Sequence, residues 1–138
     1  MSVAENKAVV NRYFEEVHNG RAVAVLDEIL SAELLEPTRG VVAAFKTAFP
    51  DYRITITAQV AEADVVATVW RMMGTHQGEW PSPLGPIAPT GKSIGFTGTT
   101  TLRVADGQIA EVVGTNHDHL GILQQMGALP AGQPRSGA

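Results

Sequence analysis

The stretch RITITAQVAEADVVATVWRMMGTH, residues 53–76, decides the fold class because its apolar residues recur with a period of two. In its first half, Ile54, Ile56 and Val60 alternate with polar side chains and are expected on one face of a strand. After a turn at residues 62–64, the second half is apolar on both faces. This predicts two long neighbouring strands. The second is covered by helices on one face and by something else, such as a partner subunit, on the other.

Upstream of these strands, apolar residues recur at helical spacing. A capping box formed by Ser2 and Glu5 begins the first predicted helix, and Asn19-Gly20 ends it. Two further helices are predicted over residues 23–30 and 40–49, and Pro50 stops the last one.

Downstream, the sequence predicts two more strands and a final helix. Residues 92–104 resume the alternation, Asp106-Gly107 predicts a hairpin turn, and the last strand covers residues 108–117. A short helix follows over residues 120–129, and residues 131–138 are too small and polar to pack.

A proline-rich segment separates the strands. Residues 78–91 contain Pro81, Pro83, Pro86 and Pro89, so they cannot form a helix or a central strand. We expect a loop at the mouth of the sheet that is long enough to act as a lid.

The order of three helices, four strands and one helix predicts an α+β fold in one domain, residues 1–130. We expect a cone-shaped, curved antiparallel sheet, with the N-terminal helices closing a central pocket for a small ligand.

Composition excludes several classes of function. The chain has 138 residues, a formal charge of −4 and no cysteine, so disulfides, thiolate metal sites and cysteine nucleophiles are absent. No basic run that would suit nucleic acid occurs, and neither a signal peptide nor an apolar run of membrane-spanning length is seen. We therefore expect a cytoplasmic protein with no metal, nucleic-acid or membrane partner.

Several stretches together resemble the SnoaL-like polyketide cyclases, a branch of the nuclear-transport-factor-2-like superfamily. The resemblance covers residues 6–130 through the order and spacing of its motifs. These are NKAVVNRYFEEVHNGRAVAVLDEIL, FKTAFPDYRITI, GTHQGEW, PTGKSIGFTG, DGQIAEV and DHLGILQQMGALP.

The resemblance implies cofactor-free ring closure by intramolecular aldol addition. The family's aspartate before the final leucine-glycine removes a proton next to a carbonyl, and it matches Asp118. Alternatives are a hydroxylase or epoxide-hydrolase-like enzyme on the same fold, and a non-catalytic, dimeric ligand-binding module.

Two departures bear on Asp118. Between Glu111 and Asp118 the chain has one residue more than the family pattern, which predicts a bulge near Thr115 or Asn116. A one-residue shift decides whether His117 or Asp118 faces the pocket. In addition, the segment between the second and third helices is short and lacks the histidine that many relatives carry there.

Each candidate residue has a structural alternative. We predict that Asp118 and His76 are catalytic, although Asp118 could instead cap a helix and His76 could cap loop backbone. Trp80 could either cover the pocket or anchor its loop, and His119 fits a surface or interface position better. The predicted substrate-binding residues are Tyr13, Phe14, Phe45, Trp70, Met72, Trp80, Phe96, Asn116 and His117.

The expected partners are a small apolar or aromatic substrate and a second copy of the chain. Thr97, Thr99, Thr101 and Arg103 alternate along one strand and are expected on the outer face of the sheet. This face is the predicted homodimer interface.

Overall fold

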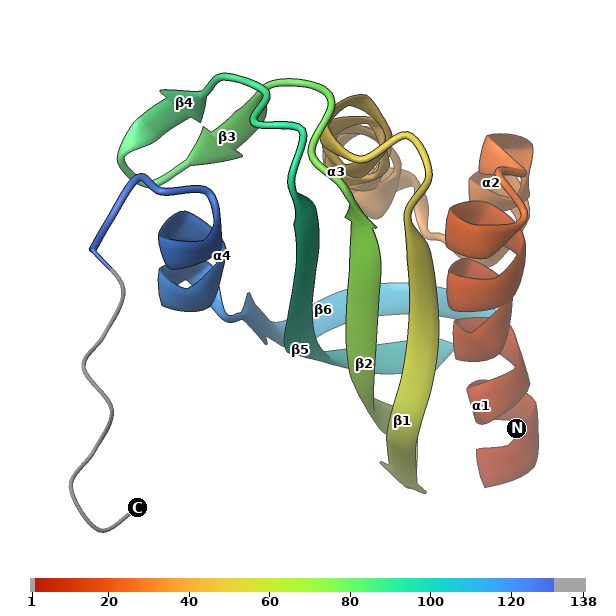
Figure 1. Cartoon of the computed structure of the whole chain (residues 1–138). Helices are drawn as coiled ribbons and strands as arrows, with labels where there is room; N and C mark the ends of the chain where they lie inside the picture. The colour runs from red at the N-terminus through yellow and green to blue at the C-terminus, as the bar shows by residue number, and fades with distance from the viewer. Residues whose placement is uncertain (1, 131–138) are drawn as a thin grey trace, which may run out of the picture.

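The computed structural model describes residues 2–130, so the predicted unstructured tail, residues 131–138, lies outside the described residues. The fold is α+β, as predicted, and Figure 1 shows helices gathered around a curved sheet. The helical elements are α1 (Val3–Arg12), η1 (Tyr13–Asn19), η2 (Val23–Val25), α2 (Leu26–Ile29), α3 (Ala32–Ala48) and α4 (His119–Gln125).

Four long strands form one antiparallel sheet in the order β1-β2-β5-β6. In Figure 1, β5 and β6 bend away from the direction of β1 and β2, which gives the sheet its strong curvature. The strands of this sheet are β1 (Arg53–Glu62), β2 (Val65–Thr75), β5 (Ser93–Ala105) and β6 (Gln108–His117).

Local signals in the sequence set several element ends as expected. The Ser2 side chain accepts a hydrogen bond from the Glu5 amide, and the Glu5 side chain accepts one from the Ser2 amide. Asp106 and Gly107 both have positive φ, at 52° and 79°, and they form the turn between β5 and β6. Both motifs act within a few residues, so the sequence is sufficient to locate them.

A bulge in β1 changes which of its side chains face the core. The pairing register between β1 and β2 shifts between Ile56 and Ala58. Beyond the shift Val60 is 68% exposed, whereas Ile54 is buried. The expectation that Val60 shares the face of Ile54 is therefore wrong, because one extra residue moves all later side chains to the other face.

The third helix is longer than its pattern suggests. It begins at Ala32 rather than at Gly40, and it contains Pro37. A proline removes one helical hydrogen bond. Here, however, Leu34 and Leu35, which precede Pro37 in the helix, pack against the core. The burial of this apolar face outweighs the local penalty.

The proline-rich segment contains a small hairpin of its own. β3 (Trp80–Ser82) and β4 (Gly85–Ile87) pair with each other and not with the main sheet. Trp80 is buried and packs against Phe45 and Phe49. Of the two alternatives for Trp80, the structure shows the anchor, because a buried ring tethers the segment to the core.

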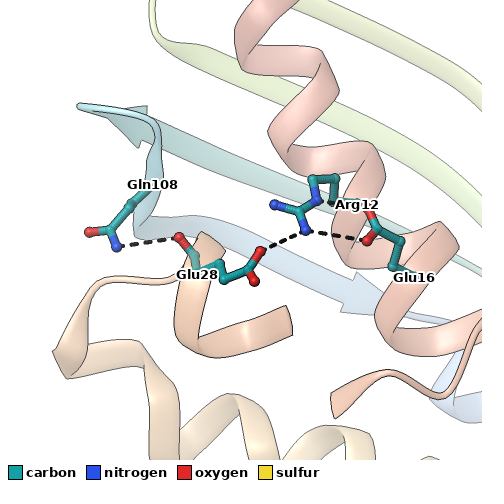
Figure 2. Close-up of polar contacts among 4 residues, drawn as sticks. All are labelled: Arg12, Glu16, Glu28 and Gln108. Atoms are coloured by element: carbon teal, nitrogen blue, oxygen red, sulfur yellow. Dashed lines mark hydrogen bonds and ion pairs between the residues drawn. The ribbon is translucent and has the colours of Figure 1, made fainter. Parts of the chain in front are cut away.

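A polar network connects the end of α1 to α2 and to the start of β6. Arg12 bonds to Glu16 at 2.7 Å and to Glu28 at 2.8 Å, and the Gln108 side chain donates to the Glu28 carbonyl at 3.4 Å (Figure 2). These groups are largely exposed, so the network orients η1, α2 and β6 but adds little stability.

Candidate functional site

A cavity of about 350 Å³ lies between the helices and the inner face of the sheet. This volume is in the range of small-molecule sites. Its lining contains no aspartate, glutamate, lysine or arginine. The lining residues are Tyr13, Phe14, His18, Leu30, Leu34, Pro37, Thr38, Val41, Phe45, Ile54, Trp70, Thr100, Leu102, Ile109, Val112, Thr115, Asn116, His117 and His119.

Aromatic rings build one wall of the cavity. Phe45 projects from α3 and lies 6.4 Å from Trp70 and 6.1 Å from Phe96, between ring centroids. Trp80 closes the far side of this group at 5.6 Å from Phe45. Edge and tilted contacts of this kind hold large side chains in fixed positions, so the wall is rigid.

The sheet register brings Trp70 and His117 to the same wall. Trp70 pairs with Gly98 on β5, and Gly98 pairs with His117 on β6. A side chain at Gly98 would place its Cβ 2.2 Å from the Trp70 ring. The missing side chain thus lets the indole lie across β5, with its ring centroid 6.4 Å from that of His117.

Of the neighbouring residues His117 and Asp118, His117 is the one that faces the cavity. Its ring packs 5.4 Å from Phe96 and 4.0 Å from His119, between centroids. Its Nε2 atom is buried and has no hydrogen-bond partner among the described residues. Burial and the neighbouring His119 lower the pKa of His117 to about 4, against the opposing effect of Asp118, so the imidazole is neutral at pH 7.

Asp118 lies outside the cavity lining. Its side chain is exposed and accepts a hydrogen bond from the Gly121 amide at 2.9 Å, as the N-cap of α4. The structure thus shows the helix-cap alternative for its position. Its catalytic role stays a prediction, since a cap and a base are different properties of one carboxylate.

The predicted bulge exists but lies earlier in β6. Leu102 pairs with Val112 and Thr101 pairs with Gly114, which leaves Val113 as the extra residue. From Gly114 onward the strand is regular to His117. A second shift, between Arg103 and Val104, leaves Ala110 as another extra residue. The inward direction of His117 therefore results from both shifts together, and neither lies near Thr115 or Asn116.

His76 holds the proline-rich segment and does not line the cavity. Its Nδ1 lies 2.9 Å from the Thr90 hydroxyl and accepts from the Thr90 amide at 3.2 Å. Its backbone bonds with Lys92 and Gly91. Burial lowers the pKa of His76, and none of its hydrogen bonds within residues 2–130 goes to Asp118. This is the loop-capping alternative, and its catalytic role stays a prediction.

The predicted substrate-binding residues divide into two groups. Met72, Trp80 and Phe96 are buried in the wall behind the cavity and do not line it. Alternation along β2 and β5 places Met72 and Phe96 on the inner face, where both are buried in the core. Phe96 packs against Phe45, Trp70 and Trp80. The predicted residues that do line the cavity are Tyr13, Phe14, Phe45, Trp70, Asn116 and His117.

Sequence reasoning missed His18. This residue sits in η1, a π-helical turn, and is 2% exposed. Its Nδ1 lies 2.8 Å from the Tyr52 hydroxyl, and it lines the cavity beside Tyr13. π-Helical turns often occur at functional sites, but the sequence carries no signal for this one.

Two further properties concern the described residues only. Within residues 2–130, no group of three or more His, Asp or Glu side chains is placed to hold a metal ion. In the same range, no helix combines the length and apolar character needed to cross a bilayer.

Comparison with family models and solved structures identifies relatives of the chain. The model of the family described as SnoaL-like polyketide cyclase matches residues 8–126. No curated protein matches the chain. Among solved structures, TsrD from Streptomyces laurentii superposes with a TM-score of 0.81 at 20% identity, over 94% of this chain and 99% of TsrD.

Two other structures share the nuclear-transport-factor-2-like fold. IdmH from Streptomyces antibioticus, a candidate polyketide cyclase, has a TM-score of 0.70 at 26% identity, over 88% of this chain and 98% of IdmH. AclR from Streptomyces galilaeus, a candidate hydroxylase, has a TM-score of 0.74 at 22% identity, over 94% of this chain and 100% of AclR. With the family model spanning most of its length, the chain belongs to the SnoaL-like polyketide cyclase family.

Proposed function

We propose that this protein closes a ring in a polyketide-like or aromatic substrate by general acid/base catalysis, without a cofactor. The observation that supports this most is the buried, unpartnered Nε2 of His117 on the wall of an apolar cavity. An unsatisfied polar atom in such a place costs free energy unless a ligand group pairs with it.

The chemistry requires one group that accepts a proton and later returns it. A neutral imidazole can take a proton from the carbon next to a substrate carbonyl, which leaves an enolate. The enolate carbon then attacks a second carbonyl of the same molecule, and a carbon–carbon bond forms. The imidazolium returns its proton to the new alkoxide, so the protein ends unchanged.

His117 and Asp118 are the two candidates for this group. His117 lines the cavity and is neutral at pH 7, with its pKa lowered to about 4. Asp118 matches the family's aspartate, but it lies outside the cavity lining and one of its oxygens caps Gly121. We therefore assign the proton transfer to His117 and keep Asp118 as the alternative base.

Proton exchange separates the two residues without knowledge of the natural substrate. The probe is 1-tetralone, an aromatic ketone whose α-protons exchange with D₂O and are followed by NMR. His117→Phe keeps a ring against Phe96 and removes the base, so the exchange rate should fall by roughly 10²–10⁴-fold. Asp118→Asn keeps a cap oxygen, so exchange should stay within about twofold.

The opposite pattern would assign the base to Asp118 and leave the reaction class intact. If the wild-type protein binds 1-tetralone but does not accelerate exchange, the acid/base proposal is overturned. Binding is measured in the same samples from ligand line broadening, so the two results are separable.

A non-catalytic ligand-binding module is the second candidate function. The engagement of Asp118 as a helix cap favours it, because the family's aspartate then has a structural role outside the cavity lining. Binding without proton exchange would support this candidate. For epoxide opening, a reaction that calls for two carboxylates bridged by an arginine, the cavity lining offers none of these groups.

A further inference from the structure

The cavity has a second polar group on its helical side, formed by His18. The ring is enclosed by aromatic neighbours, with centroids 4.6 Å from Tyr13, 5.7 Å from Phe45 and 6.2 Å from Phe14. These contacts fix the plane of the imidazole. Its orientation is therefore set before any ligand enters.

One nitrogen of His18 is occupied and the other is free. Nδ1 lies 2.8 Å from the Tyr52 hydroxyl. No residue within 2–130 makes a hydrogen bond with Nε2, although the residue is 2% exposed and lines the cavity. A polar atom that opens onto a cavity and has no protein partner is placed to bond a ligand.

The surroundings of Tyr52 decide which nitrogen carries the proton. Tyr52 is 1% exposed, and its hydroxyl has no partner among residues 2–130 other than His18. If Nδ1 donated, the phenol proton would be buried without an acceptor, which is costly. The Tyr52 hydroxyl must therefore donate to Nδ1.

Arg21 strengthens this direction of the bond. Its guanidinium lies 3.9 Å from the centre of the Tyr52 ring and donates to the Tyr52 carbonyl at 2.7 Å. A cation over the ring withdraws electron density, which makes the hydroxyl a better donor and a poorer acceptor. With Nδ1 accepting, the neutral imidazole carries its proton on Nε2.

The imidazole of His18 remains neutral at the pH of the cell. Burial, aided by the nearby Arg21, lowers the pKa of His18 to about 3. A neutral imidazole that donates a hydrogen bond can polarise a carbonyl without giving up its proton.

We propose that the Nε2–H of His18 binds and polarises a carbonyl oxygen of the ligand, on the helical wall away from His117. His18 contacts Phe45 and His117 contacts Phe96, so the two imidazoles line different parts of the cavity wall. The carbonyl bound by His18 is therefore a different group from the acidic carbon at His117. The reference to an acidic carbon at His117 rests on the proposed function. The binding of a carbonyl by His18 does not depend on it.

The tautomer of His18 tests the proposal in the unaltered protein. Protonated and unprotonated imidazole nitrogens have well-separated ¹⁵N shifts, so a long-range ¹H–¹⁵N spectrum at pH 7 reports the tautomer directly. We expect Nε2–H in the wild type and a mixture in Tyr52→Phe, which removes the donor. Nδ1–H in the wild type would overturn the proposal.

Ligand binding gives the second test, with fluorenone and fluorene as the probes. The two compounds share one tricyclic skeleton, and fluorenone has a carbonyl group where fluorene has a methylene. The double variant His18→Phe with Tyr52→Phe removes the donor and leaves no buried hydroxyl unpaired. We expect its Kd for fluorenone to rise about tenfold and its Kd for fluorene to stay within about twofold.

Tyr52→Phe alone is the matched control, because it keeps the His18 ring. A similar loss of fluorenone affinity in the single and double variants would contradict the proposal, as would equal losses for both compounds. If neither compound binds, the tautomer measurement decides alone. Both readouts are independent of turnover, so failure here is distinguishable from failure of acid/base catalysis at His117.

Discussion

At the scale of single residues, burial and neighbours give the four histidines different roles. His76 anchors a segment through Thr90, although its Nε2 is buried without a partner among the described residues. His117 lines the cavity with a buried, unpartnered Nε2, and His18 lines it while its Nδ1 bonds to Tyr52. His119 packs against His117. Identical side chains thus differ in protonation and function because the tertiary structure surrounds each one differently.

His18 should make the stability of the protein depend on pH. Its pKa is about 3 in the folded chain, against an ordinary value of 6.5. As pH falls below 6.5 the unfolded chain binds a proton that the folded chain does not. The free energy of unfolding therefore falls, by roughly 3 kcal/mol from this residue between pH 7 and pH 4.

Urea unfolding at pH 7 and pH 4 measures this contribution. The double variant His18→Phe with Tyr52→Phe should lose roughly 3 kcal/mol less than the wild type over that interval. Tyr52→Phe alone keeps the titrating ring and should follow the wild type closely. An equal loss in the double variant and the wild type would show that His18 is protonated alike in both states.

At the scale of elements, register decides which side chains meet. The two register shifts at Ala110 and Val113 together set His117 inward, and the bulge between Ile56 and Ala58 turns Val60 outward. Gly98, between Trp70 and His117, leaves the space that the indole occupies. The wall of the cavity is therefore a product of three adjacent strands and not of any one of them.

Gly98→Ala should destabilise the protein and disturb the cavity. The added Cβ would lie 2.2 Å from the Trp70 ring, so either the ring or the strand must move. Overpacking of this kind costs about 1–3 kcal/mol. Urea unfolding followed by tryptophan fluorescence measures both the loss and the changed environment of Trp70.

Gly114→Ala is the matched control on the neighbouring strand. An added Cβ at Gly114 meets no atom within 4 Å, so its stability should stay within about 0.5 kcal/mol of wild type. Equal effects of the two substitutions would contradict the role given to Gly98, because backbone entropy alone would then explain both.

At the scale of the whole molecule, the sheet has one face toward the cavity and one face free. The outer face carries exposed apolar side chains, including Val60, Val69 and Met73. It also carries Thr97 on β5, which is exposed as expected. Covering these side chains would bury apolar surface, so the homodimer through this face stays our prediction.

Val69→Lys tests the predicted dimer. Val69 lies at the middle of β2, where a buried lysine would have no partner, so the dimer dissociation constant should rise at least about tenfold. Leu84→Lys, in the β3–β4 turn, changes an exposed leucine away from the sheet and should have no effect. Sedimentation velocity over a range of concentrations measures both, and a wild type that stays monomeric would refute the prediction.

Much of this protein follows from the sequence alone. The α+β class, the order of the long elements, the Ser2–Glu5 capping box and the Asp106-Gly107 turn are encoded in local patterns. These features depend on residues a few positions apart, so periodicity and turn chemistry are sufficient to find them. The family follows from the order of motifs in the same way.

The site depended on contacts that no local pattern reports. Whether His117 or Asp118 faces the cavity was decided by two register shifts in β6, because each shift of one residue reverses every later side chain of a strand. His18 meets Tyr52 across 34 positions of sequence, and only folding brings them together. The sequence by itself determined the cone and its family, whereas tertiary structure decided which side chains meet inside it, since burial and pairing arise between distant segments.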